Sequence, residues 1–370
     1  MSPLELRRRW VYELGGVTPT GQVLRESVAG REVLERAAEA SEFERVRERT
    51  RTAREMRGSA RAGSAHGIGL ALAWHGAGFT GSGEVHLASL VHLDLGVDGR
   101  PVIRIGSTEM GQGTKTIFPQ LVAAELGIGE EDVDLAPVDT SLVPDSGPTV
   151  ASRTAMVVGG LAIQAARRLR ELVETATGLP FGASAAAYAR AHGPVRIEQR
   201  FEPYPGIHFD DSTYTGDAYP AFGWASAVAE VDVDLDTGEV AVRSVVAADD
   251  VGRVIHPVLA AGQVEGGTLQ AVGYATIEEM QLVDGRYRND RLATYLIPTA
   301  LDAPRIEAIL VESPYSGVPH GAKGVGELPM DVGAPAVVAA IHDATGVWVH
   351  ELPATPERIL AAMAAREGAA

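Results

Sequence analysis

The strongest constraint on the fold is a succession of expected elements that occurs twice along the chain. The first copy consists of two extended segments, a helix, a strand and a second helix, at 84–95, 101–105, 114–126, 132–138 and 152–175. The second copy has the same order, at 225–235, 239–247, 258–279, 305–312 and 334–345. In both copies a turn containing Asp and Gly joins the two extended segments, which is typical of a β-hairpin. Because hairpins combined with helices favour α+β lobes over a doubly wound parallel sheet, the sequence predicts an α+β fold with two similar mixed α/β lobes.

Changes in composition and residue pattern divide the chain into four parts. Residues 1–60 are expected to form an N-terminal helical segment, because the charged stretch 32–57 spaces its apolar residues as an amphipathic helix or helix pair does. Gly-rich extended segments follow, so the first lobe is placed at 61–180. A stretch rich in Pro, Gly, Tyr and Asp at 181–220 is interpreted as a loop-rich connection, and the second lobe is placed at 221–370.

The composition excludes several classes of protein. With 49 acidic and 32 basic residues the formal charge is −17, and such a surface repels nucleic acid and anionic membranes. The absence of cysteine excludes disulfides, thiolate catalysis, and an iron–sulfur cluster or thiolate zinc site held by this chain alone. The N-terminus lacks the apolar core of a signal peptide and no stretch approaches about 18 apolar residues, so we expect a cytoplasmic protein.

Four short segments place glycine around polar residues, at 109–114, 148–154, 262–267 and 321–329. Glycine lets the backbone approach a flat ligand closely and can leave amide groups free to donate to it. In the first segment Gln112 is either such a ligand contact or an exposed residue of a tight strand-to-helix turn. In the second, Thr149 or Ser152 either caps the following helix or forms an anion site with Arg153 and the helix N-terminus.

The third and fourth segments each allow two interpretations as well. The glycines of 262–267 fall within an expected helix, where each costs up to about 1 kcal/mol relative to alanine. They therefore indicate close packing against either a neighbouring helix or a cofactor plane. The fourth segment ends with Glu327, a carboxylate just before a helix. A helix N-terminus favours the ionised carboxylate, so Glu327 is either a charge–dipole cap or a general base.

Taken in this order, the segments resemble the molybdopterin-binding subunit of the xanthine dehydrogenase and aldehyde oxidase family, the molybdenum hydroxylases. The family pattern is a GQG loop, a PTxAS helix start, a GQxEGG segment and a GxKGxGE loop. These stand here at 111–113, 148–152, 262–267 and 321–327. Three connecting segments also match, at 230–233, 250–252 and 295–299. The resemblance therefore covers most of the chain.

The resemblance implies that the cofactor is molybdenum-molybdopterin, with its cytosine dinucleotide form favoured. The implied cofactor-binding residues come from all four segments: Gly111, Gln112, Gly113, Thr149, Val150, Ala151, Ser152, Gln263, Lys323 and Gly324. Glu327 would take the proton of a metal-bound hydroxyl, whose oxygen then attacks an electron-poor carbon while hydride passes to a sulfido ligand. The dithiolene of the pterin would hold molybdenum, so no side chain is expected to be a metal ligand.

The resemblance also implies partners. Family members usually carry this region behind a first half that supplies the glycine-rich loop facing the metal, a substrate-orienting arginine and the aromatic walls of the pocket. We therefore expect a split subunit, as in nicotinate dehydrogenase-type enzymes. It would act with a first-half molybdopterin-binding subunit, a [2Fe–2S] subunit and an FAD subunit, and on a small-molecule substrate.

Several functions remain open on the sequence. The leading interpretation is hydroxylation of an electron-poor carbon of an N-heterocycle, such as a purine or nicotinate-like ring, with water-derived oxygen. An aldehyde oxidoreductase subunit would use the same base. A non-catalytic scaffold would tolerate Gln or Ala at position 327, so the carboxylate of Glu327 argues against it. A cofactor carrier would bind the pterin without any need for a base.

Overall fold

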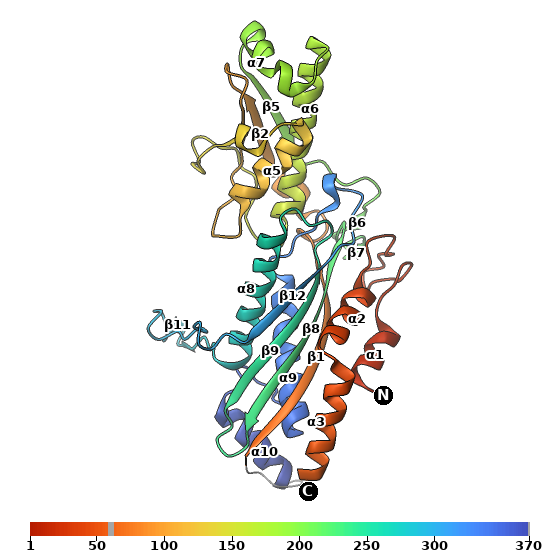
Figure 1. Cartoon of the computed structure of the whole chain (residues 1–370), viewed down its shortest axis with the longest axis vertical. Coiled ribbons are helices and arrows are strands. Elements are labelled where there is room, and N and C mark those ends of the chain that lie inside the picture. The colour runs from red at the N-terminus through yellow and green to blue at the C-terminus, as the bar shows by residue number, and fades with distance from the viewer. Residues whose placement is uncertain (58–62, 369–370) are drawn as a thin grey trace.

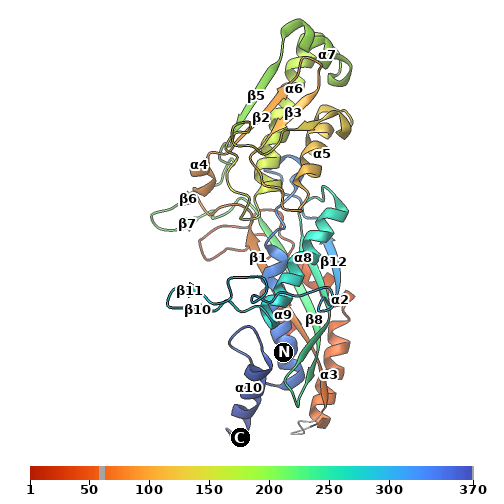
Figure 2. The ribbon, with the colours of Figure 1, turned by 90° about the vertical axis from the view of Figure 1, so that its left-hand side faces the viewer.

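The computed structural model of the chain describes residues 1–57 and 63–368. Two four-stranded sheets organise an elongated molecule, and each sheet forms the centre of one lobe (Figures 1 and 2). The first sheet has the order β4-β3-β2-β5, formed by Asp134–Leu135, Pro101–Arg104, Leu90–Leu95 and Val195–Arg200. The second has the order β12-β9-β8-β1, formed by Arg305–Val311, Val240–Asp250, Phe222–Asp234 and Ser64–Gly76.

The two sheets share one topology. The hairpins β2–β3 and β8–β9 are antiparallel, and β4 or β12 runs parallel to the second strand of its hairpin. A fourth strand, β5 or β1, lies antiparallel beside the first strand. The flanking helices also correspond: α5 (Thr114–Leu126) and α6 (Gly159–Thr177) in one lobe, α8 (Pro257–Thr276) and α9 (Leu328–Thr345) in the other. The predicted α+β fold with two similar lobes is confirmed.

Small residues allow α9 to lie directly on the second sheet. A Cβ atom added at Gly67 or Gly69 of β1 would lie 2.2 Å from the carbonyl oxygen of Ala340 or Ala336. Apolar residues at alternate positions of β8 complete this core: Ala225, Ala227, Ala229, Val231 and Val233. Because β1 and α9 approach so closely, the end of the strand and the start of the helix are fixed relative to each other.

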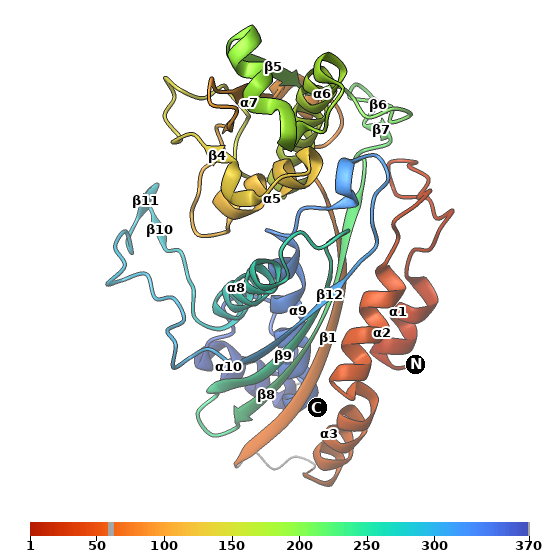
Figure 3. The same cartoon turned by 45° about the horizontal axis from the view of Figure 1, so that its top comes forward.

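Three N-terminal helices cover the opposite face of the second sheet (Figure 3): α1 (Pro3–Trp10), α2 (Gly30–Ala40) and α3 (Phe43–Arg57). Apolar side chains of these helices pack against Ile68 and Leu70 of β1 and against Trp224 of β8. The predicted amphipathic helix pair is confirmed as α2 and α3. The predicted segment 1–60 ends among residues outside the described part of the chain, and its helices are part of the second lobe.

The structure corrects three details of the predicted organisation. Strand β1 falls within 61–180 but pairs with β8, so it belongs to the second sheet. The stretch 181–220 contains α7 (Phe181–His192) and β5, which complete the first lobe. A short helix, α4 (Gly83–Leu87), replaces the start of the extended segment expected at 84–95. Burial of apolar faces, and not order along the chain, decides which strands pair.

The remaining elements are short or lie outside the two sheets: η1 (Glu130–Asp132), the π-helical turn η2 (Thr154–Val158), β6 (Phe209–Asp210), β7 (Thr215–Gly216), β10 (Leu282–Val283), β11 (Arg286–Tyr287), η3 (Pro319–Gly321) and α10 (Pro356–Gly368). The β10–β11 hairpin projects from the body on a long loop in all three views (Figures 1, 2 and 3). Within 1–57 and 63–368, none of the helices combines the length and the apolar character that crossing a membrane requires.

Candidate cofactor pocket

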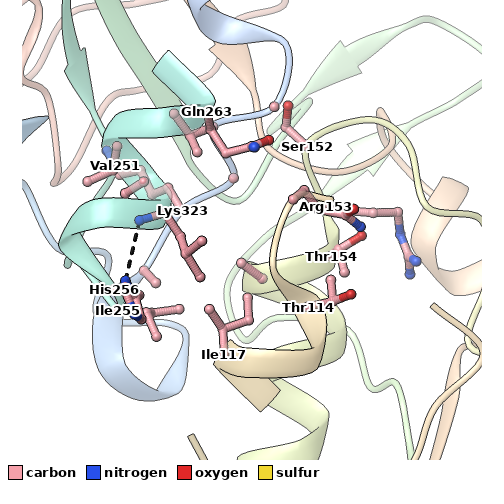
Figure 4. Close-up of a pocket in the computed structure, with 18 of the residues that line it drawn as sticks. Thr114, Ile117, Ser152, Arg153, Thr154, Val251, Ile255, His256, Gln263 and Lys323 are labelled. Carbon is pink, nitrogen blue, oxygen red and sulfur yellow. Dashed lines mark hydrogen bonds between the residues drawn. The ribbon is translucent and has the colours of Figure 1, made fainter. Parts of the chain in front are cut away.

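All four glycine-bracketed segments meet at one pocket of about 380 Å³ between the two lobes (Figure 4). Most of the residues predicted to bind the cofactor line it, together with the predicted base: Gln112, Thr149, Val150, Ala151, Ser152, Gln263, Lys323, Gly324 and Glu327. Gly111 and Gly113 lie beside the lining residue Gln112 but do not line the pocket themselves. Segments more than two hundred residues apart in sequence therefore form a single site.

Glu109 organises the first segment. Its carboxylate accepts hydrogen bonds from the amides of Gly111 at 2.8 Å, Gly113 at 3.1 Å and Lys115 at 2.9 Å. Partial burial opposes ionisation of Glu109, but these amide hydrogen bonds and one from the Thr114 hydroxyl outweigh it and lower the pKa to about 2. The expectation that the amides of Gly111 and Gly113 are free for a ligand is therefore wrong, because Glu109 already occupies them.

The side chain of Gln112 is also bound within its loop. Its Oε1 accepts from the amide of Met110 and its Nε2 donates to the carbonyl of Thr108, both at 2.6 Å. The amide of Thr108 donates in turn to Thr149 Oγ1 at 2.9 Å, which joins the first segment to the second. Gln112 thus lines the pocket with a carboxamide that is held in place before any ligand binds.

The second and fourth segments fit against each other at Ser152. Ala151 and Ser152 have φ values of 56° and 48°, a left-handed conformation that costs non-glycine residues on the order of 1–3 kcal/mol each. Across from this turn, a Cβ atom at Gly324 would lie 1.5 Å from the carbonyl oxygen of Ser152. Position 324 therefore has to be glycine for the two segments to approach as they do.

This contact orients Glu327. Ser152 Oγ donates to Glu327 Oε2 at 2.8 Å and accepts from the amide of Glu327 at 3.1 Å. Glu327 is the residue immediately before α9, and 48% of its side chain is exposed. The second lobe thus supplies a carboxylate at the edge of the pocket, and the first lobe holds it by one hydroxyl.

Two cations near these segments have structural partners. Arg153 is fully buried, and its guanidinium donates to Glu84 at 2.7 Å and 2.9 Å and to the carbonyl of Ser146 at 3.0 Å. The interpretation of Arg153 as part of an anion site is therefore wrong. Lys323 is 3% exposed, and its Nζ lies 2.6 Å from Asp250 Oδ2. Its side chain turns into the second lobe, so Lys323 presents only its main chain to the pocket.

Comparisons with known proteins identify the family. A family model of the molybdopterin cofactor-binding domain matches residues 36–304. The chain belongs to this family, that of the xanthine dehydrogenases and aldehyde oxidoreductases. It is 33% identical to a probable xanthine dehydrogenase subunit of Bacillus subtilis, over 80% of this chain and 42% of that protein. It is 31% identical to the gamma subunit of the 6-hydroxypseudooxynicotine dehydrogenase complex of Paenarthrobacter nicotinovorans, over 79% of this chain and 39% of that protein.

The fold of the chain also matches that of a solved structure from this family. The aldehyde oxidoreductase from Desulfovibrio desulfuricans superposes with a TM-score of 0.83 at 28% identity, over 98% of this chain and 38% of that one. The chain therefore spans about two fifths of the length of the relatives it matches.

The pocket fits a molybdopterin cofactor on the chemistry of its lining. Two of its wall segments, 149–152 and 322–326, include Ala151, Ala322, Gly324 and Gly326, whose small or absent side chains let a flat pterin approach closely. The amide of Gln263 points across the pocket toward Ser152 (Figure 4), and its side chain makes no hydrogen bond within the described part of the chain. Arg253 lines the same pocket without an ion pair among the residues described, so it offers a charge for an anionic group.

The three glycines of the third segment have different surroundings. A Cβ at Gly267 would lie 3.1 Å from Pro329 Cβ, so this glycine allows α8 to pack on the start of α9. Gly262 and Gly266 face open space, with no atom within 4 Å of an added Cβ. Helix packing therefore explains Gly267 only.

Sequence reasoning missed several pocket residues between β9 and α8. Arg253 and His256 line the pocket directly after the matched segment 250–252. His256 Nδ1 accepts from the amide of Leu259 at 3.3 Å, the dashed line in Figure 4, and so caps α8. The sequence feature that could have identified these residues is Pro257. Proline at the first helical position marks the start of a helix, so the residues before it lie at the helix N-terminus.

Proposed function

We propose that the chain is the half of a molybdenum hydroxylase that carries the catalytic base, acting on an electron-poor carbon of an N-heterocycle such as a purine or nicotinate-like ring. The observation that carries the proposal is the position of Glu327 at the edge of the four-segment pocket, with Ser152 Oγ at 2.8 Å. A helix cap alone would not need a hydroxyl from the opposite lobe to fix its orientation.

The residues of this chain support a general-base step. When bound, the molybdenum cofactor supplies the two-electron oxidation and the water-derived oxygen. Glu327 Oε2 is occupied by Ser152, whereas Oε1 accepts no hydrogen bond from the described residues. We assign the incoming proton to Oε1, because the lone pairs of that oxygen are free to accept it. Gln263 would contact the pterin, and Arg253 would balance the charge of a phosphate.

The cofactor form and the partners are part of the same proposal. We expect the cytosine dinucleotide form of molybdopterin, a first-half molybdopterin-binding subunit, and [2Fe–2S] and FAD subunits. Support comes from relatives that are themselves named as subunits, among them the gamma subunit of the 6-hydroxypseudooxynicotine dehydrogenase complex, and from an exposed apolar loop. Its exposed apolar residues are Met280, Leu282, Val283, Tyr287, Leu292, Leu296, Ile297 and Leu301, the last of them 98% exposed. A cluster of this kind is typical of a surface that a partner covers. The cytoplasmic location expected from the sequence stays a prediction.

A second candidate is an aldehyde oxidoreductase subunit. The likeness to the Desulfovibrio desulfuricans enzyme at 28% identity over almost the whole chain favours it. The two candidates share Glu327, and in both the residues that select the substrate would lie on the partner half. Rates with purines, nicotinate-like rings and aldehydes, measured on one preparation, distinguish them.

The test is purification of the tagged chain from its host, with metal and pterin analysis. We expect molybdenum to arrive with a second pterin-binding subunit and an iron–sulfur protein, and the preparation to oxidise an N-heterocycle. If the isolated chain instead binds pterin tightly and stoichiometrically without partners, the carrier interpretation replaces the hydroxylase. If it arrives alone and free of metal, the scaffold interpretation does.

A further inference from the structure

His75 lies between two carboxylates at the start of α9. It is near the end of β1, and its Nδ1 is 2.9 Å from Asp331 Oδ2 while its Nε2 is 3.2 Å from Glu327 Oε2. Asp331 follows Glu327 by four residues, so the two carboxylates lie one helical turn apart on the same face. The imidazole therefore bridges them, and one of the two is the proposed base.

The arrangement favours the imidazolium form of His75. A neutral imidazole has one N–H donor and cannot donate to both carboxylates, whereas the cation has two. The hydrogen bond that His75 donates to Asp331 raises the pKa of His75, burial opposes this, and the charges of Asp331 and Glu327 raise it further. On β8 the register partner of His75 is Gly223, which carries no charge, and from the turn before α6 the Ser152 hydroxyl contacts Glu327. The charged groups that act on His75 are Asp331 and Glu327.

We propose that the Asp331–His75 pair positions Glu327 for catalysis, with the imidazolium holding the carboxylate by Oε2 so that Oε1 faces the pocket. The inference rests on the proposed function and adds a positioning residue to it. Ser152 and His75 both contact Oε2, from opposite lobes of the site. The two together leave one carboxylate oxygen free to accept the proton that the base removes.

The pH dependence of turnover distinguishes this role from a structural one. In His75→Gln no imidazolium remains to lose its proton, so the alkaline limb of kcat that this deprotonation produces should be lost. Asp331→Asn keeps the imidazole but removes its stabilising partner, so the alkaline limb should move to lower pH. Loss of a merely structural contact would lower kcat or stability without removing or moving that limb.

The chain offers a matched control at the other end of β1. His66 also lies between two carboxylates, at 2.8 Å from Asp232 and 2.9 Å from Glu230. It is nine residues from His75 along the strand, roughly 30 Å at the usual rise per residue. His66→Gln therefore removes a similar pair without touching the pocket, and it should leave the pH profile of kcat unchanged.

The experiment combines two readouts. In the full chain with isotope-labelled histidine, the NMR signal missing in His75→Gln should titrate above the ordinary histidine pKa of 6.5, and Asp331→Asn should lower its midpoint. In the assembled enzyme, kcat of each variant is measured against pH at matched molybdenum content. If His75→Gln does not assemble, Asp331→Asn decides, since it retains the imidazole.

The results that overturn the inference differ from those that overturn the proposed function. An unchanged alkaline limb in an active His75→Gln enzyme, or in Asp331→Asn, contradicts the positioning role while leaving the hydroxylase assignment intact. A titration midpoint of His75 that Asp331→Asn does not change also contradicts it. A wild-type assembly without molybdenum or activity contradicts the proposed function, whatever the NMR titration shows.

Discussion

Replacement of Gly324 by alanine tests whether the contact between the two lobes orients Glu327. An added Cβ would lie 1.5 Å from the Ser152 carbonyl oxygen, whereas real Cβ atoms essentially never approach within 3.0 Å of another heavy atom. The obstructing atoms are the carbonyl oxygen, the carbonyl carbon and the Cβ of Ser152, in a turn that already holds two residues at positive φ. Rotation of a side chain moves none of them, so it cannot relieve the overlap. The lobes must separate locally, which should open the 2.8 Å hydrogen bond from Ser152 to Glu327.

Gly326 provides the matched control for this substitution. Neither Gly324 nor Gly326 has a positive φ, so the backbone conformation of both suits alanine. A Cβ at Gly326 would meet only Ser152 Oγ, at 3.8 Å, an ordinary van der Waals distance. Gly326→Ala should therefore be neutral or stabilise by about 0.4–1 kcal/mol through the unfolded state. Gly324→Ala should destabilise by about 3 kcal/mol, the upper part of the range for overpacking.

The assay is urea unfolding of both full-length variants, followed by kcat of the assembled enzymes at matched molybdenum content. We expect Gly324→Ala to lose stability and most of its turnover, and Gly326→Ala to retain its stability. Equal effects of the two substitutions on the free energy of unfolding would refute the steric argument. A destabilised Gly324→Ala enzyme with normal turnover would show that the Ser152 contact does not orient the base.

Three further predictions follow from the hydrogen bonds and charges of the site. Ser152→Ala should lower kcat roughly 10- to 100-fold, because a hydrogen bond to a charged group contributes about 1.5–3 kcal/mol. An unchanged kcat at equal molybdenum content would show that Ser152 does not orient Glu327. Lys323→Met leaves Asp250 buried without its partner and should cost about 3–5 kcal/mol in urea unfolding, while the double variant Lys323→Met, Asp250→Asn should recover part of the loss. Because the folded-state pKa of Glu109 is lowered from 4.5 to about 2, its stabilising effect is present above pH 4.5 and is lost as the pH falls toward about 2. The difference in unfolding free energy between wild type and Glu109→Gln should shrink over that interval, and a constant difference would show that the loop hydrogen bonds are not formed.

Local patterns in the sequence were sufficient to predict much of this structure. The Asp-Gly and Thr-Gly turns with alternating apolar residues identify both hairpins, and glycine around polar residues identifies the segments that meet at the pocket. These features depend on conformations and spacings of neighbouring residues. The sequence can therefore show them without knowledge of the tertiary structure.

Features that depend on long-range contacts could not be predicted. The partner of Lys323 lies 73 residues away at Asp250, and no local pattern connects the two. His75 and Asp331 are 256 residues apart and meet only because β1 packs on α9 through Gly67 and Gly69. The pairing of β1 with the second sheet likewise depends on long-range contacts, because β8 lies far from β1 in the sequence. Glu109 was closer to prediction, since a carboxylate two residues before a glycine turn is a common acceptor for its amides.

The most direct test of the central claim is the turnover of Glu327→Gln in the assembled enzyme at measured molybdenum content. Gln retains the size of the side chain and can still accept from Ser152, but it cannot take a proton. We predict assembly and molybdenum content close to wild type, with turnover abolished. A variant that retains more than a few per cent of wild-type turnover would remove Glu327 from the role of base, and the function of the pocket would then have to be sought in other residues.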